Sequence, residues 1–213
     1  MKSNINLLQP GQRYHIFNRG INGENLFKEK KNYAYFLQKY MQYVEPVAKT
    51  YAYCLLKNHF HLLVEIRSIE EIQANFLAPG QTLEYQSKFK DEYSAGLFAG
   101  RQFGHLFNSY SQSINKAYKR TGGLFEEPFR RIPVYTDSYF STMIWYIHYN
   151  PQKHRFVADF KEYPHSSYQI HLSDTPTRLE RQAVLDWFGG KAGYIEYHKN
   201  QHNISDLDLE DGF

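Results

Sequence analysis

The 213-residue sequence contains a single cysteine, Cys54, and this scarcity excludes several kinds of site. One cysteine cannot form an internal disulfide, and it cannot supply a zinc site built from several thiolates. The lack of internal disulfides is typical of proteins in a reducing compartment, so we expect this protein to be cytoplasmic.

Long hydrophobic segments are missing as well. No run of about 18 apolar residues occurs, so we expect no membrane span and no membrane partner. Residues 1–6, MKSNIN, do not lead into a long apolar segment, so we expect no signal peptide. There is no internal repeat, and the length suits one substantial domain with at most a small appendage.

The net charge of the chain is only +3, but it is unevenly distributed. Residues 206–211, DLDLED, hold four acids and no base. The remainder has 25 basic and 18 acidic residues and therefore carries +7. A basic body with an acidic tail fits a polyanionic partner, and it fits ordinary surface charge equally well.

The first third of the chain shows clear periodicity, which predicts a β-α-β-β order. The expected elements are a strand at 12–18, an amphipathic helix at 27–44, a strand at 49–56 and an antiparallel strand that begins at His59. A proline at 46 ends the helix, and the two residues before His59 are enough for a hairpin turn.

The middle of the chain has weaker signals. Residues 69–76 are compatible with a short helix, but 67–104 is rich in glycine and polar residues, and we interpret it as a flexible insertion or lid. A helix at about 103–120 and an extended segment at 124–134 follow. A further helix is expected from Asp137, as its N-cap, to about Asn150, with Pro151 ending it.

His59 and His61 stand two residues apart within the predicted strand. Alternate side chains of a strand project to the same face, so the two imidazoles lie about 6–7 Å apart along one face and can converge on a metal ion. The residues expected on the opposite, core-facing side are Phe60, Leu62, Val64 and Ile66. Half-buried histidines that bind no metal would show the same spacing.

Tyr146 and Asn150 are neighbours one turn apart on the helix after Asp137. A tyrosine oxygen can attack phosphorus and form a covalent phosphotyrosine, and a nearby metal ion would polarise the phosphate. Two other tyrosines are alternatives for this role, because Tyr139 lies seven residues earlier on the same face and Tyr149 is adjacent to Asn150.

Aromatic and basic residues are interleaved in 124–134. Phe125 and Phe129 stand beside Arg130 and Arg131, a pattern that suits stacking on unpaired bases with contacts to phosphates. A surface strand with a solvated charged face would look the same. A second basic group ends the preceding helix, where cations also simply complement the helix dipole; it consists of Lys116, Lys119 and Arg120.

Two short motifs resemble a known family. His59-Phe60-His61 resembles the histidine–hydrophobic–histidine motif of HUH enzymes, and residues 146–151, YIHYNP, resemble the tyrosine motif of single-tyrosine HUH transposases. Within these, the sequence is similar to the REP-associated tyrosine transposases. Further similar segments are YHIFNRG at 14–20, GLF at 123–125, PFR at 128–130 and SSY at 166–168. The resemblance covers about residues 11–170.

The resemblance implies an α+β fold, a ferredoxin-like antiparallel sheet flanked by helices. It implies a catalytic domain at 1–170. Beyond the resemblance, we expect a small C-terminal helical extension with the acidic tail at 171–213. Relatives of this kind act as monomers or as dimers that exchange the tyrosine helix, so a homodimer is one expectation. One departure is Arg155, at a position where we expect a glycine; a left-handed backbone there would be slightly strained.

The resemblance also implies a metal-dependent single-stranded DNA endonuclease and strand transferase that cleaves at or near DNA hairpins. His59, His61 and Asn150 would bind Mg²⁺ or Mn²⁺, and two imidazoles suit Mn²⁺ at least as well. Tyr146 would be the nucleophile, leaving a 5′-phosphotyrosine and a free 3′-hydroxyl. The residues expected to contact DNA are Lys116, Lys119, Arg120, Phe125, Arg130, Arg131, Lys153 and Arg155.

Two other functions fit the sequence. A host-adopted protein could keep hairpin DNA binding or repeat processing without transposition. A metal phosphodiesterase could use water as its nucleophile, and Tyr146 would then be structural.

Overall fold

The computed structural model describes residues 7–76 and 91–200, so the acidic tail predicted at 206–211 lies outside the described residues. The strands are β1 (Arg13–Arg19), β2 (Ala48–Leu55), β3 (His59–Ile66) and β4 (Arg130–Pro133). The helices are α1 (Lys30–Tyr43), α2 (Ile69–Phe76), α3 (Glu92–Tyr118), α4 (Asp137–Lys153), α5 (Tyr168–Leu172), α6 (Arg181–Trp187) and α7 (Lys191–Lys199), with short 3₁₀ helices at Ile21–Gly23 and Phe160–Glu162.

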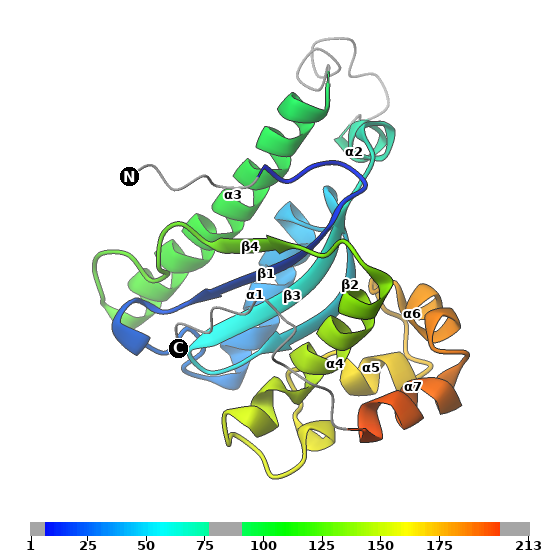
Figure 1. The fold of residues 1–213 in the computed structure, drawn as a ribbon. Helices are drawn as coiled ribbons and strands as arrows, with labels where there is room; N and C mark the ends of the chain where they lie inside the picture. Colours follow the sequence, from blue (N-terminus) through cyan, green and yellow to red (C-terminus); the bar gives the residue numbers. More distant parts are fainter. Residues whose placement is uncertain (1–6, 77–90, 201–213) are drawn as a thin grey trace.

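The described strands form one antiparallel sheet in the order β2-β3-β1-β4 (Figure 1). With α1 between β1 and β2, and α3 between β3 and β4, this is the ferredoxin-like order. The predicted α+β fold is therefore confirmed. The strand with the two histidines, β3, lies in the interior of the sheet, between β2 and β1.

Helices cover both faces of the sheet, and each face has its own hydrophobic core (Figure 1). On one face, Phe60 of β3 packs against Phe36 of α1, in a cluster that also contains Phe103 of α3. On the other face, Leu63 of β3 clusters with Ile144 of α4. His59 and His61 share one face of β3, as their spacing predicts, and the structure turns that face toward α4.

The α3 helix corrects the last part of the predicted insertion at 67–104, whose residues 77–90 lie outside the described residues. It begins at Glu92 rather than near 103, so residues 92–104 are helical, and α2 occupies 69–76. Asp91 caps the helix by accepting a hydrogen bond from the Ser94 amide. Gly96 misled the sequence interpretation because it serves packing: a Cβ there would lie 2.6 Å from the carbonyl oxygen of Leu8.

The α4 helix also differs from the prediction at both ends. The N-cap is Thr136 rather than Asp137, because the Thr136 hydroxyl accepts a hydrogen bond from the Tyr139 amide. Pro151 lies inside the helix, which continues to Lys153. A proline in the last turn removes one hydrogen bond near a helix end, so the helix tolerates it there. Arg155 has a φ of 60°, the left-handed conformation anticipated at that position.

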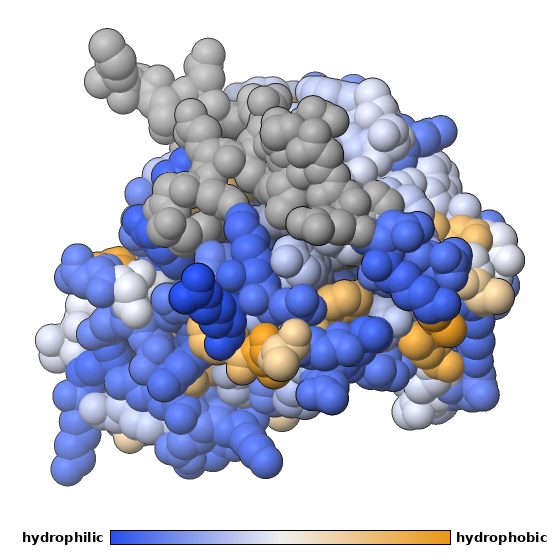
Figure 2. All heavy atoms as spheres, turned by 60° about the horizontal axis from the view of Figure 1, so that its bottom comes forward, coloured by the Kyte–Doolittle hydropathy of each residue, from blue (hydrophilic) through white to orange (hydrophobic). Residues whose placement is uncertain are grey.

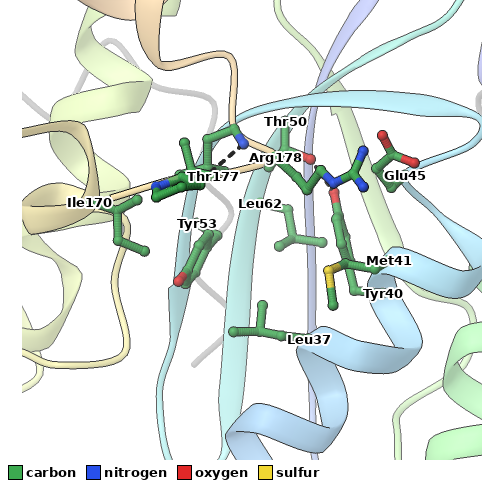
Figure 3. A pocket seen from close by; sticks show the side chains of 12 residues that line it. Leu37, Tyr40, Met41, Glu45, Thr50, Tyr53, Leu62, Ile170, Thr177 and Arg178 are labelled. Atoms are coloured by element: carbon green, nitrogen blue, oxygen red, sulfur yellow. Dashed lines mark hydrogen bonds between the residues drawn. The ribbon is translucent and has the colours of Figure 1, made fainter. Parts of the chain in front are cut away.

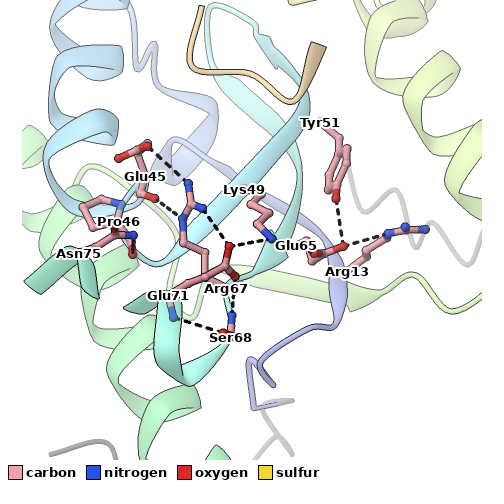
Figure 4. Close-up of polar contacts among 10 residues, drawn as sticks. All are labelled: Arg13, Glu45, Pro46, Lys49, Tyr51, Glu65, Arg67, Ser68, Glu71 and Asn75. Carbon is pink, nitrogen blue, oxygen red and sulfur yellow. Dashed lines mark hydrogen bonds and ion pairs between the residues drawn. The ribbon is translucent and has the colours of Figure 1, made fainter. Parts of the chain in front are cut away.

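A network of ion pairs ties together the end of the sheet farthest from His59 (Figure 4). Glu71 lies 2.9 Å from Lys49 and 3.6 Å from Arg67, and Glu65 lies 3.3 Å from Arg13. Such pairs are individually weak in water, but a connected network holds β1, β2, β3 and α2 in register.

No helix within residues 7–76 and 91–200 is both long enough and apolar enough to cross a membrane. On the face shown in Figure 2, hydrophilic side chains dominate and the hydrophobic ones form small separate groups. The part of that face that is not covered by grey atoms is therefore mainly polar.

The C-terminal helices pack beside α4 and bury His171 of α5. The Nε2 of His171 donates a hydrogen bond to the carbonyl oxygen of Tyr51, at 2.8 Å. Its Nδ1 is buried and has no hydrogen-bond partner in the described part of the chain. Burial lowers the pKa of His171 to about 4, because a proton on Nδ1 would place a charge in an apolar environment.

Acidification from about pH 7 to about pH 5 is expected to lower the free energy of unfolding by about 2 kcal/mol through His171 alone. The unfolded chain binds a proton near pH 6.5, whereas the folded protein resists protonation until about pH 4. The contribution is therefore complete above the unfolded pKa and is lost as the pH falls toward the folded one. Urea titrations at the two pH values measure it. The His171→Gln variant keeps a donor for Tyr51 and should lose less stability; equal losses would contradict the assignment.

Candidate active site

The histidine face of β3 and one face of α4 meet inside the protein. The Oδ1 of Asn150 lies 3.3 Å from the Nε2 of His59. The ring of Tyr146 makes an edge contact with the ring of His61, and 5.8 Å separates the centroids. Tyr146 and Asn150 are fully buried, and the two histidines are at most 3% exposed. The structure thus brings together the four residues singled out in the sequence, in a site that is closed to solvent.

The hydrogen bonds of His59 determine where its lone pair lies. The Oδ1 of Asn58 is 2.9 Å from Nδ1 of His59. Both nitrogens of His59 face amide oxygens, which can only accept, but a neutral ring has a single proton. The shorter contact, to Asn58, favours that proton on Nδ1, which leaves the lone pair on Nε2. That lone pair faces Asn150 Oδ1, which is a second acceptor. Two acceptors that converge in a buried space are an arrangement that a bound cation would stabilise.

His61 is held from the neighbouring strand by His15. The Nε2 of His15 lies 2.9 Å from Nδ1 of His61, and the two rings stack with centroids 5.1 Å apart. Because this contact uses Nδ1, Nε2 is the atom through which His61 would bind a metal. Burial, with smaller contributions from His15 and other nearby histidines, holds the pKa of His61 well below its usual range. The ring is therefore neutral, which is the form that binds metals.

The end of α4 brings two more polar residues to the site. The Nζ of Lys153 lies 3.3 Å from the hydroxyl oxygen of Tyr146, to which it donates, and 4.9 Å from the centre of that ring. The ring of His154 makes an edge contact with His59, at 4.9 Å between centroids. Lys153 was expected to contact DNA, and here it contacts the tyrosine.

His15 and His154 belong to the site but were not predicted from the sequence. Alternation along β1 places His15 and Phe17 on one face, but it does not say which strand lies beside β1. The pairing of β1 with β3 decides that, because it sets Phe17 opposite His61. His154 lies one turn after Asn150, so helical spacing could have placed it beside that residue.

The residues present fit a small divalent metal site that is incomplete without further ligands. Among the described residues, no three His, Cys, Asp or Glu side chains are grouped so that they could hold a metal ion. A site at this place would need Asn150 in addition to the two imidazoles. Asn150 Nδ2 is also buried and has no hydrogen-bond partner in residues 7–76 and 91–200. Two imidazoles and one amide oxygen leave positions for water or phosphate oxygens, as Mg²⁺ and Mn²⁺ require.

The alternative tyrosines lie in different surroundings. The ring of Tyr149 stacks on Trp145 of the same helix, with centroids 4.8 Å apart. Tyr139 lies two turns before Tyr146, near the start of α4, and is partly buried against the α4-side core. Tyr146 is the tyrosine with a ring contact to His61.

Arg130 and Arg131 are neighbours on β4 but project to opposite faces of the sheet. Arg130 is exposed and pairs in register with Phe17, whose ring stacks on His15, so it lies on the histidine face. Arg131 pairs with Ile16 on the α3 face. The sequence grouped these arginines as one DNA-binding pair, and the sheet separates them.

The other basic and aromatic candidates are scattered. Lys116 and Lys119 are exposed at the end of α3, and Arg155 is exposed after α4. Arg120 forms an ion pair with Glu24, and it ties the end of α3 to the following loop. Phe125 is buried in the hydrophobic core on the face of the sheet that α1 and α3 cover. A base could stack on its ring only after the ring left that core.

A separate cavity of about 380 Å³ lies on the opposite face of the sheet (Figure 3). Leu37 and Met41 of α1 form one wall, Leu62 of β3 lies behind it, and the segment around Arg178 closes it. It is mainly apolar, and the sheet separates it from the histidines.

A solved structure supports the class of fold. The chain is similar to a REP-associated tyrosine transposase bound to a REP hairpin, with a TM-score of 0.55 and 12% sequence identity. The similarity covers 83% of this chain and 89% of that chain. No protein-family model and no curated protein matches the sequence. The chain therefore has the fold of this transposase, at a sequence identity too low to transfer more than the fold.

Proposed function

We propose that this protein is a metal-dependent single-stranded DNA endonuclease and strand transferase that acts at or near DNA hairpins through a covalent 5′-phosphotyrosine. The observation that carries the proposal is the meeting of two faces: Asn150 Oδ1 lies 3.3 Å from His59 Nε2, and Tyr146 contacts His61. The fold shared with a hairpin-bound tyrosine transposase supports DNA as the partner.

In the proposed reaction, the oxygen of Tyr146 attacks the phosphorus of a DNA phosphodiester. A bond forms between that oxygen and phosphorus as the bond from phosphorus to the 3′ oxygen breaks. The Tyr146 hydroxyl gives up its proton and the 3′ oxygen takes one up, so the strand leaves with a free 3′-hydroxyl and the protons balance. Bound Mg²⁺ or Mn²⁺ would polarise the phosphate. Attack by another 3′-hydroxyl on the phosphotyrosine reverses the step and joins strands. Because Tyr146 is fully buried, the DNA must enter a site that is closed in this structure.

Two further residues would support the reaction. Lys153 donates to the Tyr146 oxygen at 3.3 Å, so it would orient that oxygen and balance its developing negative charge. His15 would hold His61 with Nε2 directed at the phosphate-binding position.

Incubation with a single-stranded DNA hairpin tests the proposal. The wild-type protein should form an adduct that survives denaturing electrophoresis in Mn²⁺ or Mg²⁺ and is absent in EDTA. Stable hairpin binding without an adduct in any metal would support the host-adopted DNA-binding protein instead. Metal-dependent cleavage without an adduct would favour a phosphodiesterase that uses water.

The His15→Leu variant is expected to bind Mn²⁺ about tenfold more weakly than the wild type, because His61 loses the partner that orients it. Calorimetric titration of Mn²⁺ measures this without DNA. His15→Gln keeps a polar side chain that can reach Nδ1, and it should restore part of the affinity. Equal affinity of His15→Leu and wild type would show that His15 has only a packing role.

Neutralising Arg130 is expected to weaken DNA binding and to lower the slope of log affinity against log salt by about 0.7 to 0.9, the value for one phosphate contact. Arg130 is exposed on the histidine face, where the DNA backbone would pass. The control is Lys31→Gln on α1, a cation on the other face of the sheet, which should leave the slope unchanged. An Arg130→Gln variant with the wild-type slope would contradict the contact.

A further inference from the structure

A groove of about 650 Å³ lies between α3 and the loop that leads into β4. It is separate from the histidine site, because α3 packs on the other face of the sheet. Its walls combine amide side chains, a stacked arginine and phenylalanine pair, and a carboxylate rim. This combination is more polar than the cavity beside α1.

On the side of the groove formed by α3, polar side chains stand next to free space. Asn108 and Gln112 are exposed, lie one helical turn apart and line the groove. Gly104 lies one turn before Asn108, and a Cβ built there meets nothing within 4 Å. The groove therefore has free space directly over the helix, flanked by amides that can both donate and accept hydrogen bonds.

Arg131 and Phe129 form a second wall of the groove. The guanidinium of Arg131 lies over the Phe129 ring, 3.8 Å from its centre. The Nε of Arg131 is buried and has no hydrogen-bond partner among the described residues, and no carboxylate in that part of the chain forms an ion pair with Arg131. A planar cation stacked on an aromatic ring is a surface on which nucleobases stack.

The remaining wall carries acidic side chains. Their negative charge indicates whether a base or a phosphate binds in the groove. Glu126 already pairs with Arg19, at 2.6 Å, but Glu127 is exposed at the groove. A carboxylate at this position repels phosphate and accepts hydrogen bonds from amino groups of bases. The charge pattern therefore favours the base end of a nucleotide.

The groove lies close to the end of the sheet that carries His59. Arg19, the ion-pair partner of Glu126, pairs with His59 across β1 and β3. The loop is joined to β1 by a bridge between Gly20 and Phe125. A strand bound at the histidine site could therefore pass over the end of β1 and reach the groove.

We propose that this groove binds an unpaired base of single-stranded DNA next to the hairpin, with the base against Arg131 and its edge read by Asn108, Gln112 and Glu127. The proposal rests on the proposed function for its DNA partner. It assigns the groove to recognition of the strand rather than to the chemistry, and it predicts a preference for bases with an exocyclic amino group over thymine.

The test fills the groove and leaves its polar side chains in place. Gly104→Leu places a side chain in the free space over the helix and increases helix propensity, so the fold should be retained, as circular dichroism can verify. The probes are a DNA hairpin without a tail, the same hairpin with a 5′ or a 3′ single-stranded tail, and tails that carry 2-aminopurine. All binding is measured in EDTA, so that no reaction occurs.

Gly104→Leu should weaken binding of the tailed hairpin by about tenfold, the contribution of one stacked base, and leave the tail-less hairpin unaffected. The fluorescence of 2-aminopurine should fall on binding to wild type and not to the variant. A second variant, Asn108→Ala with Gln112→Ala, should lose the preference for cytosine over thymine tails. The matched control is His105→Ala, which changes an exposed side chain of the same helix outside the groove.

Equal affinity of wild type and folded Gly104→Leu for every tailed hairpin would overturn the groove assignment. That result is distinguishable from failure of the proposed function, because adduct formation in metal does not depend on it. A tail effect that disappears in Gly104→Leu, in a protein that forms no adduct, would leave the groove assignment standing and remove the chemistry.

Discussion

Tyr146→Phe is expected to abolish the covalent protein–DNA adduct, with a loss of at least about a thousandfold in the rate of its formation. The substitution removes one oxygen, which is the proposed nucleophile. It leaves the ring in the hydrophobic core between the sheet and α4. It also removes the hydrogen bond that this oxygen accepts from Lys153 at 3.3 Å. Folding and hairpin affinity should change little, so that the effect lies in the chemical step.

The other tyrosines of α4 supply matched controls. Tyr149→Phe keeps the stack on Trp145, and Tyr139→Phe changes a ring two turns away, so both variants should form the adduct at near wild-type rates. Adducts are measured by denaturing electrophoresis of a labelled hairpin with Mn²⁺. An adduct that persists in Tyr146→Phe and disappears in either control would assign the nucleophile to that other tyrosine.

His59→Leu is expected to lower the affinity for Mn²⁺ at least about a hundredfold, more than the loss of an outer partner such as His15. Leucine has a similar size but no donor atom, so it removes the Nε2 that faces Asn150 Oδ1 while it fills the same space. Calorimetry reports the affinity directly. Thermal unfolding reports it independently, because Mn²⁺ should raise the Tm of wild type by mass action and not that of the variant.

The matched control for the metal prediction is His105→Leu. His105 is exposed on α3, on the other side of the sheet, and its change should leave Mn²⁺ binding and the Tm shift intact. If His59→Leu binds Mn²⁺ as tightly as wild type, the metal does not bind between β3 and α4. The mechanism would then need another position for it.

Local patterns predicted the elements that carry the candidate site. The alternation in β3 separated His59 and His61 from the core residues Phe60 and Leu62, and the structure confirms those faces. The i, i+4 spacing on α4 made Tyr146 and Asn150 neighbours. Where local signals conflicted with packing, the prediction was wrong. The glycines at the start of α3 indicated a loop, but Gly96 is required by the close approach of Leu8.

The sequence by itself determined which side chains share a face of β3 or of α4, because the periods of strands and helices are properties of neighbouring residues. It did not determine which faces meet. Tertiary structure alone decided that His15 contacts His61, that Asn150 contacts His59, and that Arg130 and Arg131 serve different sides of the sheet. These contacts depend on strand register and helix packing between residues far apart in the chain, and no local period encodes them.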